Sequence, residues 1–236
     1  MNSPRIILAV DTPDLEMARN WIETTSEYIA AYKLGLEFFL KFGPEGVRKI
    51  REISGADLFL DLKLHDIPNT VASAVVQVTD LAPRFLTVHA SGGSAMISAA
   101  VENAPLVEIT AVTVLTSLSD SEIGEIGFAG RALDTATNMA KLAVKAGAAA
   151  IVCSPLEVVA IREAVGPGIS IITPGVRPAD HGVSDDQART MTPEAAVALG
   201  ASYVVIGRPI TGLWKQGPSA MAKKASEISE QINKNL

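Results

Sequence analysis

Three charged residues with close spacing follow an apolar segment at residues 58–60. They are Asp61, Lys63 and Asp66. Side chains alternate between the two faces of a strand, so Asp61 and Lys63 should point to the same side, and Asp66 follows in a turn that Pro68 helps to define. Carboxylates on both sides of an ammonium group favour its charged form. The pattern therefore predicts that Lys63 is a fixed cation or a proton donor, and a poor Schiff-base nucleophile.

By itself, this spacing also fits a solvated turn with a surface ion pair. The rest of the chain argues against that interpretation, because polar or charged residues close its apolar runs. These residues are Asp11, Lys33, Asp61 with Lys63, His89, Thr116, Ser154, Pro174 with Arg177, and Gly207 with Arg208. Lys33 and Asp61 lie inside apolar runs, where a charge is rarely buried without a partner. We therefore predict a network in which Lys33 and Lys63 lie among Asp11, Asp61 and Asp66.

Eight short apolar runs are predicted to be the strands that position these side chains. They are residues 6–10, 30–34, 58–62, 85–89, 109–115, 149–153, 169–173 and 203–206. Nearly continuous apolar character is typical of parallel strands covered on both faces. Helical patterns lie between and after them, at residues 15–25, 44–54, 70–81, 94–102, 132–146, 156–165, 193–199 and 220–232. Eight β-then-α units in 236 residues predict a single (β/α)8 TIM barrel over residues 1–236, with a doubly wound open sheet as the alternative.

Two predicted loops are longer than their neighbours, at residues 116–131 and 174–190. Both follow the C-terminal end of a predicted strand, which is the end where barrels build active sites. Long loops inside compact domains are usually functional lids or disordered segments. We therefore expect the functional site at this end of the barrel.

The composition narrows the classes of function. A net charge of −6 and a pI of about 5.1 argue against a nucleic-acid partner, although a few cations in a cleft still attract an anionic small molecule. The single cysteine, Cys153, is expected in the core. The first apolar run is too short for a signal peptide, and no run approaches the roughly 20 residues that cross a membrane. We expect a cytoplasmic protein that binds neither nucleic acid nor membrane.

An anion site is predicted at the last strand. Phosphate-binding barrels place this site in the loops after strands seven and eight. Gly207 would let the backbone approach an anion, and Arg208 would bind it in bidentate fashion, with Arg177 on the neighbouring loop. A tight turn with a surface arginine is the alternative for Gly207-Arg208 alone. Metal-ligand spacings and glycine-rich nucleotide motifs are absent from the sequence, so we expect no metal and no cofactor.

The longest motif resembles the signature of the bacterial orotidine 5′-monophosphate decarboxylase family. It reads Phe59-Leu60-Asp61-Leu62-Lys63-Leu64-His65-Asp66-Ile67-Pro68-Asn69-Thr70. The resemblance extends over essentially the whole chain. It includes Ala9-Val10-Asp11, Lys33-Leu34-Gly35, Val88-His89-Ala90-Ser91-Gly92-Gly93, Ala111-Val112-Thr113-Val114-Leu115-Thr116-Ser117, Thr173-Pro174-Gly175-Val176-Arg177-Pro178 and Ile206-Gly207-Arg208-Pro209.

The resemblance implies cofactor-independent decarboxylation of orotidine monophosphate to uridine monophosphate, the last step of pyrimidine nucleotide synthesis. It implies that Lys63 donates a proton to C6, that Asp61 presses on the substrate carboxylate, and that Asp66 and Lys33 complete the charged array. The other residues that it implies in substrate binding are Asp11 and Lys33 for the ribose, Thr116 for the pyrimidine, Ile67 and Pro174 for the leaving carboxylate, and Arg177, Gln187, Gly207 and Arg208 for the phosphate. It also implies a homodimer in which Asp66, Ile67 and Thr70 reach into the partner's site.

Two other functions remain open. A magnesium-dependent sugar-phosphate decarboxylase or aldol-type synthase shares the barrel and the Asp-x-Lys-x-x-Asp core, but has an acidic metal ligand where this chain has Lys33. A lysine there disfavours a divalent cation, because two positive charges would meet. A non-catalytic phosphate-binding barrel would need the anion clamp alone, and the complete acid–base array argues against it.

Overall fold

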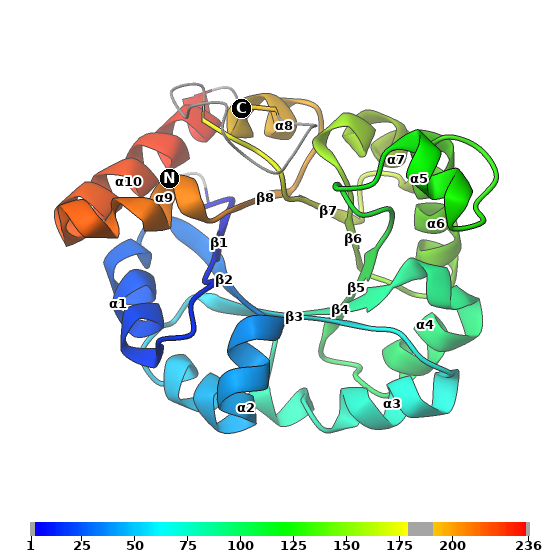
Figure 1. The fold of residues 1–236 in the computed structure, drawn as a ribbon, viewed down its shortest axis with the longest axis horizontal. Coiled ribbons are helices and arrows are strands. Elements are labelled where there is room, and N and C mark those ends of the chain that lie inside the picture. Colours follow the sequence, from blue (N-terminus) through cyan, green and yellow to red (C-terminus); the bar gives the residue numbers. More distant parts are fainter. Residues whose placement is uncertain (1–2, 179–190, 235–236) are drawn as a thin grey trace.

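The strands form a closed parallel barrel surrounded by helices (Figure 1). The structure, a computed structural model, describes residues 3–178 and 191–234. Each strand pairs in parallel with the next one along the chain, and β1 (Ile6–Ala9) also pairs with β8 (Tyr203–Ile206). The β1–β8 pairing closes the sheet. The TIM barrel is therefore confirmed, and the open-sheet alternative is wrong.

The remaining elements follow the expected β-then-α order. The strands are β2 (Ile29–Gly35), β3 (Asp57–Leu64), β4 (Phe85–His89), β5 (Glu108–Val112), β6 (Ala150–Val152) and β7 (Ser170–Thr173). The helices are α1 (Leu15–Thr25), α2 (Leu36–Arg51), α3 (Pro68–Val76), α4 (Gly93–Glu102), α5 (Asp120–Glu125), α6 (Ala132–Lys145), α7 (Val158–Val165), α8 (Pro193–Ala198), α9 (Arg208–Thr211) and α10 (Pro218–Lys234). Short 3-10 helices are η1 (Thr79–Leu81), η2 (Ala90–Gly92), η3 (Pro155–Glu157) and η4 (Gly212–Gln216). No helix of the described part of the chain is both long and apolar enough to cross a membrane.

Helix α2 begins eight residues before its predicted start, directly after β2. Gly43 interrupts it with φ 60° and ψ −166°, and Pro44 begins a second helical stretch. Proline is favoured in the first turn of a helix, so the sequence pattern revealed this second stretch only. Five of the seven residues before Gly43 are apolar, so this short stretch was not recognised as a helix separate from β2.

The segment at residues 116–131 was predicted to be an irregular loop, and this is wrong in part. It contains α5, which begins with a capping box. The Ser119 hydroxyl accepts from the backbone N–H of Glu122, and the Glu122 carboxylate accepts from the backbone N–H of Ser119. The Asp120 carboxylate accepts from the N–H of Ala132 at 2.7 Å, which ties α5 to the start of α6. These capping hydrogen bonds thus order the segment, although it has no long apolar face.

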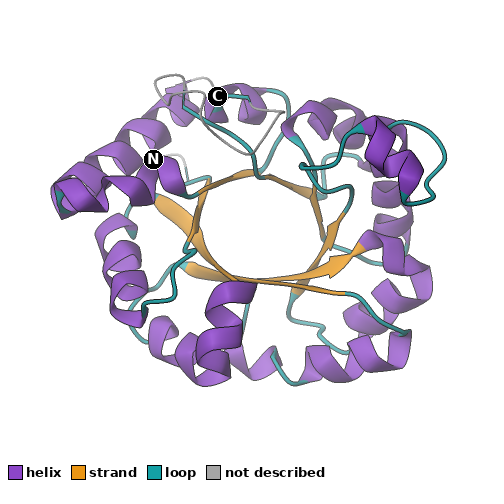
Figure 2. Cartoon of the chain, in the orientation of Figure 1, coloured by secondary structure: helices purple, strands orange, loops and turns teal. Residues whose placement is uncertain are grey.

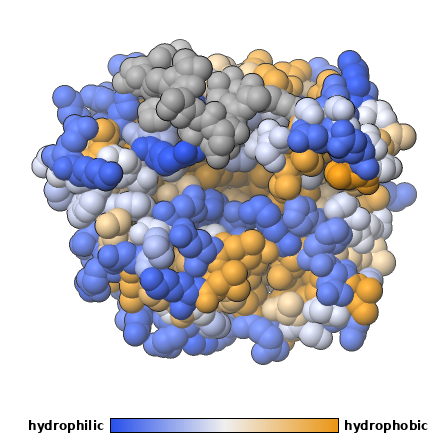
Figure 3. Space-filling view, in the orientation of Figure 1, coloured by the Kyte–Doolittle hydropathy of each residue, from blue (hydrophilic) through white to orange (hydrophobic). Residues whose placement is uncertain are grey.

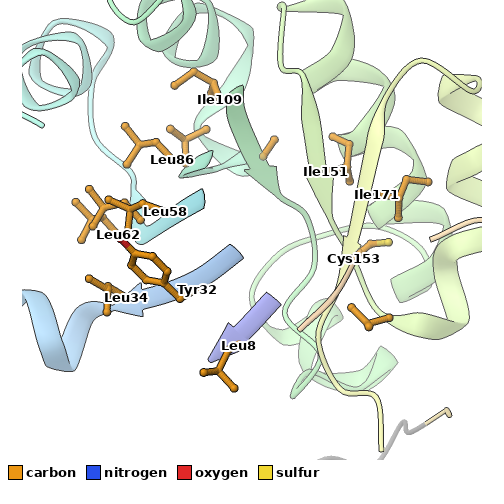
Figure 4. Packing of buried hydrophobic residues seen from close by; sticks show 14 of the residues in the cluster. Leu8, Tyr32, Leu34, Leu58, Leu62, Leu86, Ile109, Ile151, Cys153 and Ile171 are labelled. Atoms are coloured by element: carbon orange, nitrogen blue, oxygen red, sulfur yellow. The ribbon is translucent and has the colours of Figure 1, made fainter. Parts of the chain in front are cut away.

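The strands form an inner ring and the helices an outer ring (Figure 2). Alternation along the strands produces two apolar layers. Outward-facing side chains pack between the sheet and the helices, and Leu8, Tyr32, Leu58 and Leu86 illustrate this layer in Figure 4. Inward-facing side chains fill the barrel below the mouth. They are Ile7, Ala9, Ala31, Phe59, Phe85, Ala150, Ile172 and Val205. The interior is therefore packed and not a pore.

Arg84 closes the N-terminal end of the barrel. Its guanidinium donates to Asp57 at 2.9 Å, to Glu108 at 3.0 Å and to the hydroxyl of Tyr203 at 3.0 Å. It also lies over the ring of Phe85, 4.7 Å from the centroid. One planar cation thus joins strands β3, β5 and β8. We therefore assign a structural role to this end of the barrel and expect the functional site at the other end.

Candidate active site

A cavity of about 190 Å³ opens at the C-terminal ends of the strands. Its charged lining residues are Lys33, Asp61 and Lys63. Its other lining residues are Phe59, Val112, Val114, Leu115, Thr116, Val152, Cys153, Pro174 and Val205. The face seen in Figure 3 is hollowed near its centre, with hydrophobic atoms inside the hollow and hydrophilic residues along its border. The site therefore offers charge on one side and apolar surface on the others, which suits a planar ring that carries a reacting group.

Four residues of the predicted Asp–Lys network, Asp11, Lys33, Asp61 and Lys63, lie together beside this cavity. The Lys63 ammonium lies 2.8 Å from both carboxylate oxygens of Asp61, and the Lys33 ammonium lies 3.4 Å from Asp61 Oδ2. Lys33 also lies 3.1 Å from Asp11 Oδ1. The side chains of Lys33 and Asp61 are only 13% and 11% exposed, whereas Asp11 is 62% exposed. Asp61 is thus a largely buried anion that two cations share.

Burial and charge act in opposite directions on this network. Burial alone would raise the pKa of Asp61, but Lys33, Lys63 and the hydrogen bond from Thr87 outweigh it and the pKa is lowered. Burial alone would lower the pKa of Lys33, but Asp61 and Asp11 outweigh it and the pKa is raised. Both groups are therefore ionised at neutral pH before any ligand arrives.

Lys63 occupies an irregular position in β3. The register between β3 and β4 is regular at Leu60↔Leu86 and resumes at Leu64↔Val88, so β3 bulges between these pairs. Within the bulge Lys63 has a φ of 49°. A left-handed backbone is uncommon for a residue with a side chain and is found where the surroundings impose it, often at functional sites. The bulge re-aims Lys63 so that its ammonium folds back onto Asp61.

The predicted anion-binding residues lie at the ends of β7 and β8. Arg177 donates from its backbone N–H to Met191 at 2.8 Å, and its guanidinium donates to the carbonyl of Val176 at 2.9 Å. Arg208 is exposed at the start of α9. A Cβ added to Gly207 would lie 3.2 Å from Cβ of Ala9, so this position has little room for a side chain. Gln187, the fourth predicted phosphate ligand, lies outside the described residues.

Three other predicted residues lie apart from the network. Asp66, Ile67 and Thr70 are exposed at the start of α3, and Pro68 is the first residue of that helix and not part of a turn. The Asp66 carboxylate accepts from the N–H of Ile67 at 2.6 Å. Among the ion pairs between described residues, none joins Asp66 to Lys33 or Lys63. The expectation that Asp66 flanks Lys63 within one chain is therefore wrong, since Asp66 is an exposed residue between β3 and α3.

Several residues at the site were not predicted from the sequence. Phe59, Val112, Val152 and Val205 line the cavity from inward-facing strand positions. Alternation within their strands could have placed them, because each lies an even number of residues from another inward-facing position. Thr87 of β4 was also missed, and it has no sequence signal because its role depends on the register between β3 and β4.

Histidines and metal ligands complete the description of this end. His65 is exposed, and its ring centroid lies 5.4 Å from that of His89. Burial, His65 and Lys63 lower the pKa of His89. Across residues 3–178 and 191–234, His, Cys, Asp and Glu residues do not gather in groups of three or more that could hold a metal ion.

The comparison with protein families identifies the family of this barrel. The profile of the Orotidine 5'-phosphate decarboxylase / HUMPS family matches residues 4–225. The chain belongs to this family.

Individual relatives agree with this membership. The chain is 51% identical over 220 residues to orotidine 5'-phosphate decarboxylase of Thermobifida fusca, which covers 93% of this chain and 94% of the relative. It is 47% identical over 234 residues to the enzyme of the same name from Frankia casuarinae, with 92% and 85% covered. The crystal structure of orotidine 5'-phosphate decarboxylase from Lactobacillus acidophilus superposes with a TM-score of 0.84 at 32% identity, covering 98% of this chain and 100% of that one. Among members of the Orotidine 5'-phosphate decarboxylase / HUMPS family, the chain is thus similar to decarboxylases in both sequence and fold.

Proposed function

We propose that this chain converts orotidine monophosphate to uridine monophosphate and CO2 without a cofactor, as a step of pyrimidine synthesis in the cytoplasm. The observation that carries the proposal is the contact of Lys63 and Lys33 with one buried carboxylate, Asp61, at the floor of an otherwise apolar cavity. Family membership and the names of the relatives support the same reaction.

The chemistry follows from this arrangement of charge. When the bond between C6 and the carboxylate breaks, CO2 leaves and the electron pair stays on C6, in an orbital that the pyrimidine ring cannot delocalise. The Lys63 ammonium stabilises this pair and then transfers a proton to C6. Lys63 becomes neutral and regains a proton from solvent. Preorganised charge of this kind is worth most in a site with little water, because no reorganisation is needed as the charge develops.

Asp61 has two effects in this scheme. It holds the Lys63 ammonium at 2.8 Å, which orients the proton donor before substrate binds. It also places a negative charge beside the substrate carboxylate, and this repulsion disappears when neutral CO2 forms. The apolar surface of Val112, Val152 and Pro174 then accepts CO2 more readily than a carboxylate.

Binding energy would come from the remote parts of the nucleotide. We assign the phosphate to Arg177, Gly207 and Arg208, with Gln187 as a fourth ligand. We assign the ribose hydroxyls to Asp11 and Lys33, whose side chains meet at 3.1 Å at the edge of the cavity. Thr116 lines the cavity and would contact the pyrimidine. A phosphate anchored away from C6 can supply energy that drives the reacting end against Asp61.

We also propose a homodimer in which Asp66, Ile67 and Thr70 of each subunit complete the site of the other. Ile67 is 65% exposed although it is apolar, and Leu36 and Leu40 of α2 are 46% and 81% exposed. Exposed apolar residues of this size are typical of surfaces that another protein covers. An Asp66 carboxylate from the partner would give Lys63 a second anion, beside the one that the described part of its own chain supplies.

Lys33 weighs against the magnesium-dependent alternative. Its ammonium already lies within 3.4 Å of Asp61 and 3.1 Å of Asp11, where a divalent cation would have to bind. A cation placed there would meet a positive charge in a poorly solvated site.

The experiment that tests the proposal follows the loss of orotidine monophosphate absorbance by the purified protein, with and without EDTA. We expect turnover that resists the chelator and that falls by at least about 10²–10⁴-fold in Lys63→Ala, the range ascribed to a positioned proton donor. Lys141→Ala is the control, because Lys141 is an exposed lysine of α6. Turnover that EDTA abolishes would favour the magnesium enzyme. Binding of uridine monophosphate without any release of CO2 would favour the phosphate-binding barrel.

A further inference from the structure

Thr87 joins the two residues at the centre of the site. It lies on β4, is fully buried, and its hydroxyl accepts from the backbone N–H of Lys63 at 2.8 Å. The same hydroxyl donates to Asp61 Oδ1 at 3.0 Å. One hydroxyl group has one proton to donate and lone pairs to accept with, so both bonds can form at once. Thr87 therefore connects the backbone of the proton donor to the carboxylate that orients its ammonium.

The bulge in β3 explains why a side chain is needed at this point. In a regular parallel ladder the N–H of a strand residue donates to a backbone carbonyl of the neighbouring strand. The register shift between Leu60↔Leu86 and Leu64↔Val88 removes Lys63 from that pattern. The Thr87 hydroxyl takes the place of the missing backbone acceptor. Without it, a poorly solvated N–H would lack a partner at a residue that already has a φ of 49°.

We propose that Thr87 is a positioning residue for proton transfer, because its hydroxyl holds the Lys63 backbone in the bulge and fixes the Asp61 carboxylate against the Lys63 ammonium. The inference rests on the proposed decarboxylation. Thr87 does not line the cavity, so it acts through Lys63 and Asp61 and not on the substrate.

The charged groups around Asp61 define what the loss of the hydroxyl should do. Lys33 faces Asp61 from β2, Lys63 from β3 and Thr87 from β4, while Asp11 lies behind Lys33. Both lysines are retained when Thr87 is changed, so Asp61 remains mostly ionised. The Asp61 carboxylate loses the hydrogen bond that fixes its orientation, and the Lys63 N–H loses its acceptor. The effect should therefore fall on the reacting step more than on binding.

The experiment compares Thr87→Val with Thr87→Ser. Valine has the shape of threonine without the hydroxyl, and serine keeps the hydroxyl without the methyl group. Thr110→Val is the matched control, because Thr110 is a fully buried threonine that pairs with Thr87 on the adjacent strand β5. Its hydroxyl donates to the carbonyl of Glu108 at 2.9 Å, within its own strand.

We expect kcat to fall about 10- to 100-fold in Thr87→Val, the size of a lost hydrogen bond to a charged group. We expect KM to change less than about threefold, since the Thr87 hydroxyl bonds to Lys63 and Asp61 and not to the proposed ribose ligands Asp11 and Lys33. Thr87→Ser should retain most of kcat, and Thr110→Val should behave like the unchanged protein. A purely structural role would predict equal losses in both valine variants, or a loss in Thr87→Ser as large as in Thr87→Val. Either result would overturn the inference, as would a rise in KM with kcat unchanged.

A second measurement separates this inference from the proposed reaction. The carboxyl carbon of Asp61 can be followed by 13C NMR against pH in the ligand-free protein, with Asp61→Asn to assign the signal. The Asp61 carboxyl should begin to protonate at higher pH in Thr87→Val than in Thr87→Ser, because a donor to the charged form has been removed. Identical titrations would overturn the inference. Failure of the unchanged protein to release CO2 would refute the proposed reaction alone, since the titration needs no substrate.

Discussion

Replacement of Asp61 by asparagine should destabilise the ligand-free protein more than replacement of either lysine that Asp61 contacts. Asparagine keeps the shape of the side chain and removes its charge. Among the described residues, Asp61 is the only carboxylate within 4.0 Å of the Lys63 ammonium. Lys33 would keep Asp11, whose side chain is 62% exposed and therefore screened by water. The substitution thus leaves two cations close together with one weak anion.

The size of the effect follows from burial. Removal of one partner of a buried ion pair costs about 3–5 kcal/mol. The Asp61 side chain is 11% exposed but that of Lys63 is 31% exposed, so the lower end of that range, about 3 kcal/mol, is expected. For a chain of this length, such a loss lowers Tm by about 6–12 °C. Lys33→Met should cost about 1 kcal/mol or less, because Asp61 keeps Lys63 and Thr87 and a buried charge is removed.

The assay is urea and thermal unfolding of the ligand-free protein at pH 7, followed by circular dichroism. Asp57→Asn is the control, since Asp57 lies at the opposite end of the same strand and its side chain is 45% exposed beside Arg84. The pKa of Asp61 is lowered in the folded protein, so its contribution is fully present above the unfolded pKa of about 3.9 and is lost as pH falls through the folded value. The difference between the unchanged protein and Asp61→Asn should therefore stay constant from pH 7 to pH 5 and shrink only below about pH 4.

Two results would refute this reasoning. Equal losses in Asp61→Asn and Lys33→Met would mean that Asp61 is not the shared anion of the network. A difference that shrinks already between pH 7 and pH 5 would mean that the folded pKa of Asp61 is raised and not lowered, so that burial outweighs the two lysines.

Other regions of the structure give four further expectations. Arg84→Met should lower Tm by about 4–8 °C, from about 2 kcal/mol of lost ion pairs and hydrogen bonds, with kcat unchanged because Arg84 lies at the other end of the barrel; a fall in kcat at full folding would contradict this. Gly207→Ala should raise KM with little change in kcat, because its Cβ would press on Ala9 at 3.2 Å and displace the backbone that we propose to bind phosphate; an unchanged KM in steady-state kinetics would contradict this. Cys153 should resist thiol reagents until the protein unfolds, since it is 1% exposed and burial raises its pKa; labelling of the native protein would refute this. The pKa of His89 is lowered by burial and nearby cations, so the protein should lose stability as pH falls below about 6.5, and His89→Gln should reduce that loss in urea titrations.

The order of elements was predictable because each strand and helix is encoded locally. A parallel strand covered on both faces needs a short, nearly continuous apolar run, and a helix that covers it needs a 3.6-residue apolar period. Eight such pairs were recognised and all eight strands are present. The first stretch of α2 was missed because it is short and mostly apolar, like the strand before it. The short helix α5 was missed because it depends on its caps.

The charged residues of the site were predictable for a related reason. Ionisable side chains at the ends of apolar runs are costly unless they meet partners, and parallel strands bring their ends together. Lys33, Asp61 and Lys63 were therefore assigned to one network before their distances were known. Their location at one end of the barrel was predicted from the residues themselves, and their roles were predicted from the resemblance to a known family.

Tertiary structure alone decided how these residues meet. Closure of the barrel depends on β1 pairing with β8, which no local pattern encodes. The bulge at Lys63, its left-handed φ and the hydrogen bonds of Thr87 depend on the register between β3 and β4. Register is a relation between strands that are distant in sequence, and a shift by one residue changes which side chains face each other. The sequence by itself thus determined which groups are at the mouth of the barrel, and the packing of strands against each other determined that Lys63 is bound to Asp61 and anchored by Thr87.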